Sequence, residues 1–177
     1  MKKILLALIV ISIILMPQLA LGSTQKIVVN KAYHLLYVES GSNIDRVIPV
    51  CIGEGGESET PTGQYTIASI VKNPTWYFEG KTYSPYIYDK GNGLGVVWMG
   101  ISLPSYGLHG TNEPFSIGGN FSHGCVRMEN TDVQFLSSIS FIGENVEIKE
   151  GTGDQIAKHL KTINALYSLM NVLNGAK

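Results

Sequence analysis

Apolar and polar residues alternate with a period of two, or gather in short apolar runs, through most of the chain after residue 22. Both patterns are typical of β-strands. The segments between them are rich in Gly, Asn, Ser and Pro, which favour turns. The pattern predicts six strands, over residues 26–30, 34–39, 46–52, 64–71, 96–101 and 145–149.

Helical periodicity appears only late in the chain. Residues 131–134 (Thr-Asp-Val-Gln) have the spacing of a capping box, and Val133, Leu136 and Ile139 follow on one face, which predicts a short helix. From residue 154 onward, apolar residues again recur at helical spacing, opposite two lysines and an asparagine. They are Ile156, Leu160, Ile163, Leu166, Met170 and Leu173. We expect this second helix to pack on the domain, with docking to a partner or a membrane surface as the alternative.

The first 22 residues have the order of a secretory signal. Two lysines precede an uncharged run over residues 4–16, and small residues stand at Ala20 and Gly22. We expect cleavage after Gly22 and an exported protein, located in the periplasm or the cell wall; an uncleaved membrane anchor is the alternative. The expected organisation is a signal peptide (1–22), one folded domain (23–150) and a C-terminal helical extension (151–177).

Composition narrows the function classes. The 177 residues include 13 Lys and Arg against 14 Asp and Glu, with no basic run, so nucleic acid is not an expected partner. A hydrophobic fraction of 44% excludes a disordered chain. Two cysteines are too few for a disulfide framework, so each needs its own explanation.

Cys125 lies close in sequence to two histidines, His109 and His123. A thiol with a free pKa of about 8.5 needs a nearby imidazole to act as a nucleophile at neutral pH. The glycine-rich residues 111–121 can fold the chain back and bring His109 to Cys125. We therefore expect a thiolate–imidazolium pair, with the pKa of the thiol lowered and that of the imidazole raised.

A glycine lies next to each of these two residues, Gly124 before Cys125 and Gly110 after His109. Gly124 leaves the backbone uncovered, so its amide and that of Cys125 are expected to stabilise an oxyanion. Gly110 has no side chain to orient His109, so a backbone carbonyl is expected to hold the second ring nitrogen.

Three alternatives stay open at this point. Residues two apart on an extended chain face the same side, so His123 is a second candidate for the base. A disulfide between Cys51 and Cys125 suits an exported chain; otherwise Cys51 is a small buried hydrophobe. A zinc site at His109, His123 and Cys125 lacks the acidic or second helical His signature, so we expect no metal and no cofactor.

With these residues in place, the sequence resembles the L,D-transpeptidase catalytic domain family, also called YkuD-like. The resemblance is carried by His109-Gly110-Thr111-Asn112 and by Ser122-His123-Gly124-Cys125-Val126-Arg127-Met128. Supporting matches are Thr60-Pro61-Thr62-Gly63, Asn73-Pro74-Thr75-Trp76 and Trp98-Met99-Gly100. The resemblance covers residues 26–149. It implies a mainly β fold, which is a β-sandwich with a short helix after the cysteine motif and a C-terminal helix outside the match.

The resemblance also implies an activity. It identifies a cysteine acyltransferase that reacts with peptidoglycan tetrapeptide stems, releases D-alanine and transfers the acyl group to an amine of another stem. Cys125 matches the nucleophile and His109 the base, while Ser122, His123 and Gly124 match the acyl site. Arg127 and Gly110 are expected to contact substrate, as are the aromatic residues Tyr106 and Trp76.

The expected partners follow from this activity. They are donor and acceptor stem peptides, and β-lactams of the carbapenem class that would acylate Cys125; membrane contact is expected only through the signal peptide. Water as the acceptor would make the protein an L,D-carboxypeptidase, and a lipoprotein amine would make it an anchoring enzyme. The alternative from another class is a non-catalytic wall-binding domain.

Overall fold

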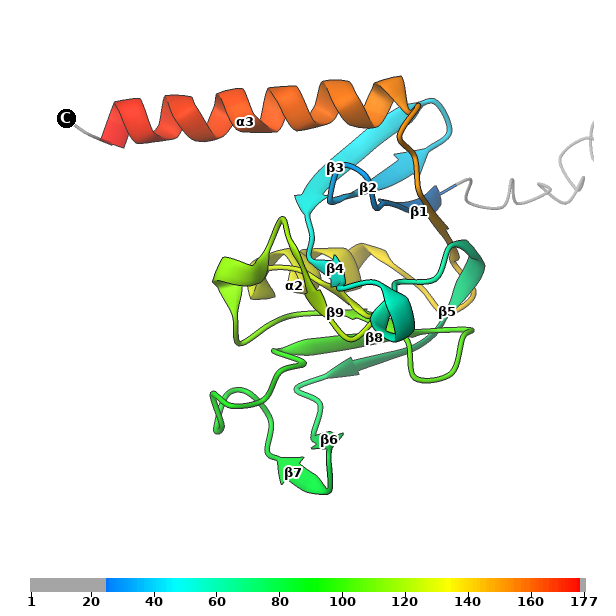
Figure 1. Ribbon diagram of the computed structural model, residues 1–177, viewed down its shortest axis with the longest axis vertical. Coiled ribbons are helices and arrows are strands. Elements are labelled where there is room, and N and C mark those ends of the chain that lie inside the picture. The colour runs from blue at the N-terminus through cyan, green and yellow to red at the C-terminus, as the bar shows by residue number, and fades with distance from the viewer. Residues whose placement is uncertain (1–24, 176–177) are drawn as a thin grey trace, which may run out of the picture.

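Strand β5 (Gly63–Lys72) organises the fold because it pairs with two different neighbours along its length. In the computed structural model, which describes residues 25–175, its first half pairs with β12 (Asn145–Lys149) and its second half with β8 (Val97–Ile101). Both pairings are antiparallel, and a bulge lies between Ile67 and Ser69. Strand β5 therefore joins the two halves of one curled sheet (Figure 1).

The complete sheet has eight strands in the order β11-β9-β8-β5-β12-β1-β2-β3. The remaining members are β1 (Gln25–Asn30), β2 (Leu35–Ser40), β3 (Asn43–Pro49), β9 (Gly107–His109) and β11 (Val126–Arg127). Two small pairs lie outside it, β4 (Ile52–Gly53) with β10 (Asn120–Ser122) and β6 (Trp76–Phe78) with β7 (Lys81–Tyr83). Short 3-10 helices span Gly56–Ser58 and Pro114–Ser116.

The predicted strands are confirmed, with one division. The segment predicted over 46–52 is split into β3 and β4, because Cys51 between them forms an isolated bridge with Arg127. Strands β6, β7, β9, β10 and β11 were not predicted. Each has only two or three residues, too few to show a period of two.

The core lies between the two halves of the curled sheet. Ile27 and Leu36 enter it from β1 and β2, and Met99 and Leu108 enter it from β8 and β9. This arrangement confirms the mainly β, sandwich-like fold. Val28 and Tyr37, which alternate with the core residues on β1 and β2, form a second small cluster on the opposite face.

Helix α2 (Asn130–Ile139) follows the cysteine segment, as predicted, but begins two residues earlier than a capping box with Thr131 as N-cap would place it. Glu129 is the N-cap and its side chain makes no capping hydrogen bond. The Asn130 carboxamide oxygen instead accepts the amides of Val96 and Thr111, each at 3.2 Å. These contacts with two distant loops fix the helix start, which a local sequence signature does not reveal.

Helix α3 (Gln155–Gly175) packs over the second cluster by its first turns, where Ala157 is buried and Leu160 is partly buried. The carboxylate of Asp154 accepts the amide of Ala157 at 3.0 Å and pairs with Lys149 at 2.9 Å. The predicted packing is thus confirmed for this end of the helix. Among residues 25–175, no helix is long and apolar enough to cross a membrane. The predicted signal peptide lies outside the described residues.

Candidate active site

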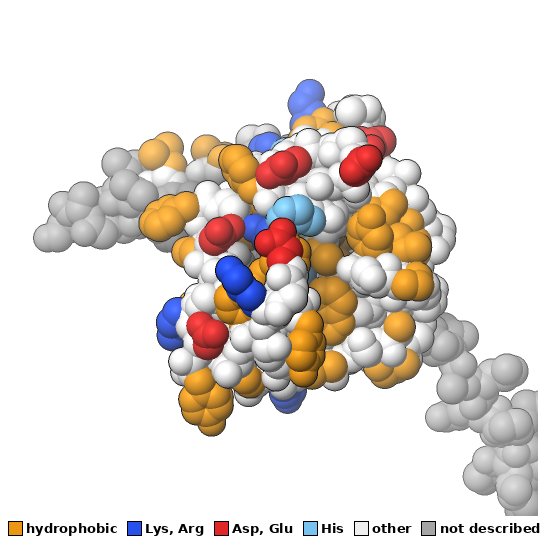
Figure 2. Space-filling view, turned by 60° about the horizontal axis from the view of Figure 1, so that its bottom comes forward, with side chains coloured by type: hydrophobic (Ala, Val, Ile, Leu, Met, Phe, Trp, Pro, Cys, Tyr) orange, Lys and Arg blue, Asp and Glu red, His pale blue; other side chains and the backbone are white. Residues whose placement is uncertain are grey.

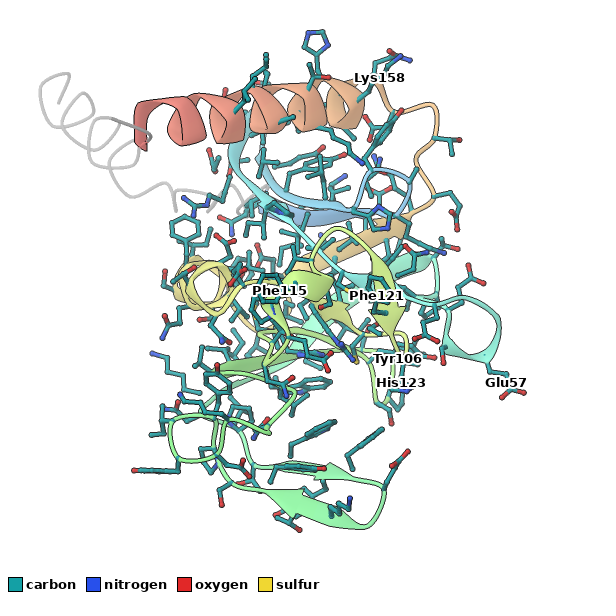
Figure 3. All side chains as sticks on the ribbon, turned by 60° about the vertical axis from the view of Figure 1, so that its left-hand side comes forward. Glu57, Tyr106, Phe115, Phe121, His123 and Lys158 are labelled. Atoms are coloured by element: carbon teal, nitrogen blue, oxygen red, sulfur yellow. The ribbon has the colours of Figure 1, made fainter. Side chains whose placement is uncertain are left out.

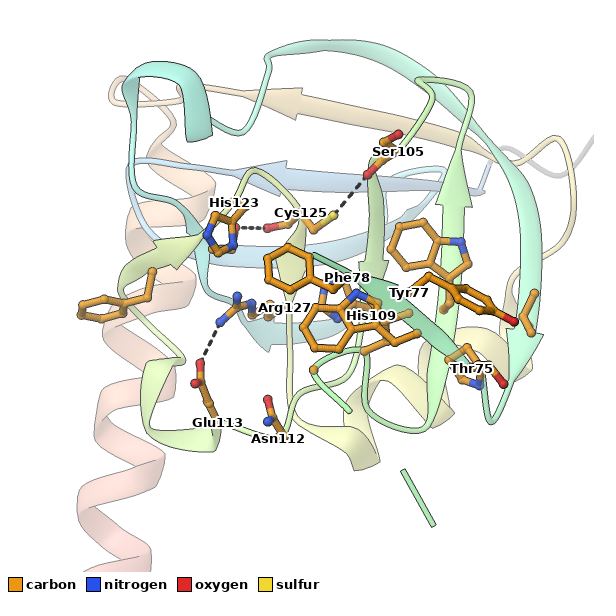
Figure 4. A pocket seen from close by; sticks show the side chains of 18 residues that line it. Thr75, Tyr77, Phe78, Ser105, His109, Asn112, Glu113, His123, Cys125 and Arg127 are labelled. Carbon is orange, nitrogen blue, oxygen red and sulfur yellow. Dashed lines mark hydrogen bonds and ion pairs between the residues drawn. The ribbon is translucent and has the colours of Figure 1, made fainter. Parts of the chain in front are cut away.

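A cavity of about 850 Å³ lies where β9 and β11 meet the β6–β7 hairpin. His109, Cys125 and Arg127 line it together with aromatic side chains, which include Trp76 and Phe78. Figure 2 shows a hollow on this face, with a histidine at its edge and hydrophobic side chains beside it. Figure 4 shows the side chains that line the cavity.

The pairing of β9 with β11 places the reactive side chains on one face. The strands are parallel, with His109 opposite Arg127 and Leu108 opposite Val126. Leu108 and Val126 are buried in the core. Because side chains alternate along a strand, Arg127 and His109 share the other face, which is the floor of the cavity, and Cys125 lines the same cavity from the turn just before β11.

The His109 ring is held in one tautomer. Its Nδ1 lies 2.7 Å from the carbonyl oxygen of Gly110, an atom that can only accept a hydrogen bond, so Nδ1 carries the proton. The ring also stacks on Trp98, with 5.7 Å between centroids. The expectation that a backbone carbonyl orients this histidine is confirmed, and Nε2 is left with the lone pair that a general base needs.

Burial decides the protonation of both groups. It lowers the pKa of His109 to about 4, although the hydrogen bond to the Gly110 carbonyl opposes it, and the charge of Arg127 adds a smaller lowering effect. Burial also raises the pKa of the Cys125 thiol, although the Gly107 backbone and Arg127 pull it down. The expected thiolate–imidazolium pair is therefore wrong for the resting protein, in which both groups are neutral.

No hydrogen bond joins Cys125 to His109 in residues 25–175. The thiol instead donates a long hydrogen bond of 3.7 Å to the carbonyl of Ser105 (Figure 4). The two side chains face the same cavity, so a substrate carbonyl placed there is accessible to both.

The turn before Cys125 is braced from within. The buried Ser122 hydroxyl donates to the carbonyl of Cys125 and accepts the amide of Gly124 at 3.1 Å. Gly124 has a φ of +111°, and a Cβ there would lie 2.6 Å from the ring of Tyr106. Only glycine fits this position. Contrary to expectation, the Gly124 amide is occupied by Ser122 rather than free for an oxyanion.

Arg127 carries an ion pair that the sequence analysis missed. Its Nη1 lies 3.0 Å from Oε2 of Glu113, and the side chain of Arg127 is 16% exposed while that of Glu113 is 63% exposed. Among the residues that line the cavity, these two are the only ones with permanent charges. Glu113 is the single acidic residue between Asp89 and Glu129 in the sequence, which is the signal that marks it.

The aromatic wall comes from the β6–β7 hairpin. Trp76 stacks on Phe78 with 4.7 Å between centroids, and Phe78 contacts the ring of the exposed His123 at 5.6 Å. Trp76 therefore lines the cavity, where we expected substrate contact. Tyr106 does not line the cavity, because its ring lies against Gly124.

Gly110 also lies outside the cavity lining, contrary to its expected place. A Cβ at this position would lie 2.1 Å from Oδ1 of Asn130, the same oxygen that accepts the amide of Thr111. Asn130 returns a hydrogen bond to the Thr111 carbonyl at 2.8 Å. Gly110 thus permits the close approach that anchors the His109 segment, and Asn130 is a positioning residue that local sequence patterns did not reveal.

The two cysteines are not joined. Cys51 is buried and free, and Cys125 is free and partly buried, so the disulfide alternative is wrong. The amide of Cys51 donates to the carbonyl of Arg127 at 2.8 Å, and its thiol packs in the interior, as expected of a small hydrophobe. Within residues 25–175, no three His, Cys, Asp or Glu side chains are grouped so as to hold a metal ion.

The chain is similar to known proteins over most of its length. The sequence profile of the L,D-transpeptidase catalytic domain, YkuD, matches residues 24–148. YkuD of Bacillus subtilis, assigned as an L,D-transpeptidase, is 34% identical over 113 residues, which cover 64% of this chain and 58% of that protein. YbiS of Escherichia coli, with the same assignment, is 32% identical over 171 residues, which cover 84% of this chain and 55% of that protein. The chain therefore spans little more than half the length of either relative.

Solved structures share the fold. L,D-transpeptidase 3 of Mycobacterium tuberculosis, in complex with a faropenem-derived adduct, superposes with a TM-score of 0.58 at 20% identity. The match covers 73% of this chain and 61% of that one. At this identity the similarity establishes the architecture alone.

Proposed function

Since this chain belongs to the L,D-transpeptidase catalytic domain family, we propose that it is an exported cysteine acyltransferase that cross-links peptidoglycan. The donor is a tetrapeptide stem. The bond cleaved joins the L-configured centre of the third residue to the terminal D-alanine. Cys125 is the nucleophile and His109 the general base.

The first half-reaction acylates the enzyme. The Cys125 sulfur attacks the carbonyl carbon as Nε2 of His109 accepts the thiol proton, which gives a tetrahedral intermediate with a negatively charged oxygen. The amide of Cys125 stabilises this oxygen, and the hydrogen bond from the Gly124 amide to Ser122 holds the turn in place. The carbon–nitrogen bond then breaks, His109 returns the proton to the amine, and D-alanine departs from a thioester.

The second half-reaction returns the free enzyme. An amine of the diamino acid in another stem attacks the thioester, and His109 accepts the proton of this amine. The carbon–sulfur bond breaks, and the proton passes to the Cys125 sulfur. The product is an amide between the third residues of two stems. Arg127, in the floor of the cavity, is placed to meet a stem carboxylate.

One observation carries the proposal: Cys125, in the turn before β11, and a tautomer-locked His109, on the neighbouring β9, face the same cavity. A wall-binding scaffold has no need of a histidine whose Nδ1 is fixed so that Nε2 can accept a proton. His123 lies exposed at the rim against Phe78, which favours His109 as the base.

Incubation with purified tetrapeptide muropeptides, followed by mass analysis, tests the reaction. We expect loss of D-alanine and formation of a cross-linked dimer. Cys125→Ala should abolish both, and the matched variant Cys51→Ala should retain them because Cys51 lies in the interior. A tripeptide product without a dimer would indicate an L,D-carboxypeptidase, and acylation that requires a lipoprotein amine would indicate an anchoring enzyme. A folded protein that binds muropeptides without acylation would support the wall-binding alternative.

We also propose that carbapenems acylate Cys125, because a strained β-lactam carbonyl presents the same electrophile to the thiol. The Mycobacterium tuberculosis relative whose structure contains a faropenem-derived adduct supports this chemistry. Intact-mass analysis should show a single added carbapenem on the wild type and on Cys51→Ala, and none on Cys125→Ala. An adduct on Cys125→Ala would contradict the assignment.

A further inference from the structure

Helix α3 leaves much of its apolar surface uncovered. Beyond the buried Ala157, the side chains of Ile163, Leu166 and Leu169 are 44%, 55% and 56% exposed. Residues spaced by three lie next to one another along a helix, so these three side chains form a continuous stripe. An uncovered apolar stripe on a folded domain is a candidate site of interaction.

The charges of α3 have one sign. The helix contains Lys158 and Lys161 and no Asp or Glu, and both lysines are exposed. Figure 3 shows Lys158 at the end of the molecule that carries α3. An exposed apolar stripe on a helix whose polar face carries lysines is typical of helices that lie in the interface of an anionic membrane.

A second copy of the chain fits this surface less well. Self-association by α3 would bring two cationic helices together, and α3 has no carboxylate to pair with the lysines of a partner. Anionic phospholipid headgroups supply the missing negative charge, and the acyl chains beneath them accept the apolar stripe.

The position of α3 suits attachment to a surface. The helix lies at one end of the molecule, and the β6–β7 hairpin lies at the other (Figure 1). His123, at the rim of the cavity, is likewise remote from Lys158 (Figure 3). A bilayer beneath α3 would therefore leave the cavity open and facing away from the membrane.

We propose that α3 docks the folded domain on a bilayer that contains anionic phospholipids. Ile163, Leu166 and Leu169 enter the boundary between headgroups and acyl chains, and Lys158 and Lys161 contact the phosphates. The helix lies in the plane of the surface, with its first turns fixed to the sheet through Ala157. This role is separate from the acyl-transfer reaction.

Vesicle co-sedimentation tests the proposal without reference to activity. The apolar residues 4–16 would bind vesicles themselves, so the protein tested begins at Ser23, which keeps all of residues 25–175. We expect binding to phosphatidylcholine vesicles that contain phosphatidylglycerol, weaker binding to phosphatidylcholine alone, and release by salt. Lys158→Gln and Lys161→Gln should each weaken partitioning about fivefold.

The chain offers a matched control. The triple variant Ile163→Gln, Leu166→Gln, Leu169→Gln should lose more than about tenfold in partitioning. A second triple variant, Ile87→Gln, Phe141→Gln, Ile142→Gln, should bind as the wild type does. These three residues are 51%, 45% and 60% exposed and lie outside α3 and the cavity lining. Circular dichroism should show both variants folded.

Three results would overturn the proposal. The first is equal binding by the wild type and the α3 variant. The second is binding that does not depend on phosphatidylglycerol. The third is a dimer of the wild type, seen by light scattering and dissociated by the α3 substitutions, in a protein that does not bind vesicles; the stripe would then be an interface between copies of this chain.

Discussion

The burial of Cys125 and His109 predicts a resting enzyme without an ion pair. Burial holds the pKa of the Cys125 thiol above its usual 9.0, which leaves at most about 1% thiolate at pH 7. His109, with a pKa of about 4, is protonated in roughly 0.1% of molecules at the same pH. An ion pair would instead carry a thiolate in most molecules at neutral pH.

Ultraviolet absorption distinguishes these states, because a thiolate absorbs where a thiol does not. The difference between the wild type and Cys125→Ala should stay near zero from pH 5 to pH 8 and rise only above pH 9. The same pH profile is expected when Cys51→Ala takes the place of the wild type in this comparison, since the change in absorption comes from Cys125. A thiolate signal already present at pH 6, and lost in His109→Ala, would refute the neutral state.

The same protonation states set the pH dependence of acylation. Since His109 must be unprotonated to act as the base, a pKa of about 4 leaves about 90% of it active at pH 5, whereas an ordinary pKa of about 6.5 would leave about 3%. Single-turnover acylation at pH 5 should therefore stay close to its rate at pH 7. A drop of about twenty-five-fold between these values, in a protein that circular dichroism shows to be folded, would show that burial does not govern this histidine.

Three further substitutions test two groups near Cys125 and one group at the start of α3. Ser122→Ala removes both hydrogen bonds that brace the turn before Cys125, so acylation should slow about tenfold in single-turnover kinetics. An unchanged rate would show that the turn keeps its conformation without these hydrogen bonds. Glu113→Gln removes the partner of Arg127 and should lower the KM for tetrapeptide stems about threefold with kcat unchanged, whereas a raised KM would show that Glu113 binds substrate itself. Asp154→Asn should cost about 1–2 kcal/mol in denaturant unfolding at pH 7. Burial alone would raise the pKa of the Asp154 carboxyl, but the Ala157 amide, Lys149 and Tyr37 hold it well below its usual value of 3.8. The stabilisation is therefore complete above that value and lost at lower pH, so the difference between wild type and variant should disappear in acid and persist at pH 7.

The sequence was sufficient where a signal is local. Strands such as β1 and β2 alternate between the two apolar clusters, and this period is legible in five or six residues. The sequence also placed Cys125 and His109 in one site, because the loop between their segments can fold back. The structure shows His109 on β9 and Cys125 in the turn that leads into β11, the strand parallel to β9.

The sequence was insufficient where long-range burial or a distant partner decides. A nearby imidazole suggested an ion pair, yet the protonation of His109 depends first on how much protein surrounds it. The Asn130 carboxamide fixes both the start of α2 and the Thr111 segment, which lies 19 residues away in the sequence. Glu113 and Arg127 are 14 residues apart, and only the folded chain makes them partners.

Burial also connects the reactivity of Cys125 with its survival as a free thiol. Oxidation, like nucleophilic attack, proceeds through the thiolate, so a neutral thiol resists oxidation in the exported location that we propose. Because the resting thiol of Cys125 is neutral, its proton must leave the sulfur only when the carbonyl of a substrate is bound in the cavity. His109 meets this requirement, because its locked Nε2 can accept the proton as negative charge passes to the carbonyl oxygen. The cavity thus holds its one permanent cation, Arg127, already paired with Glu113, and separates new charge only in the complex with substrate.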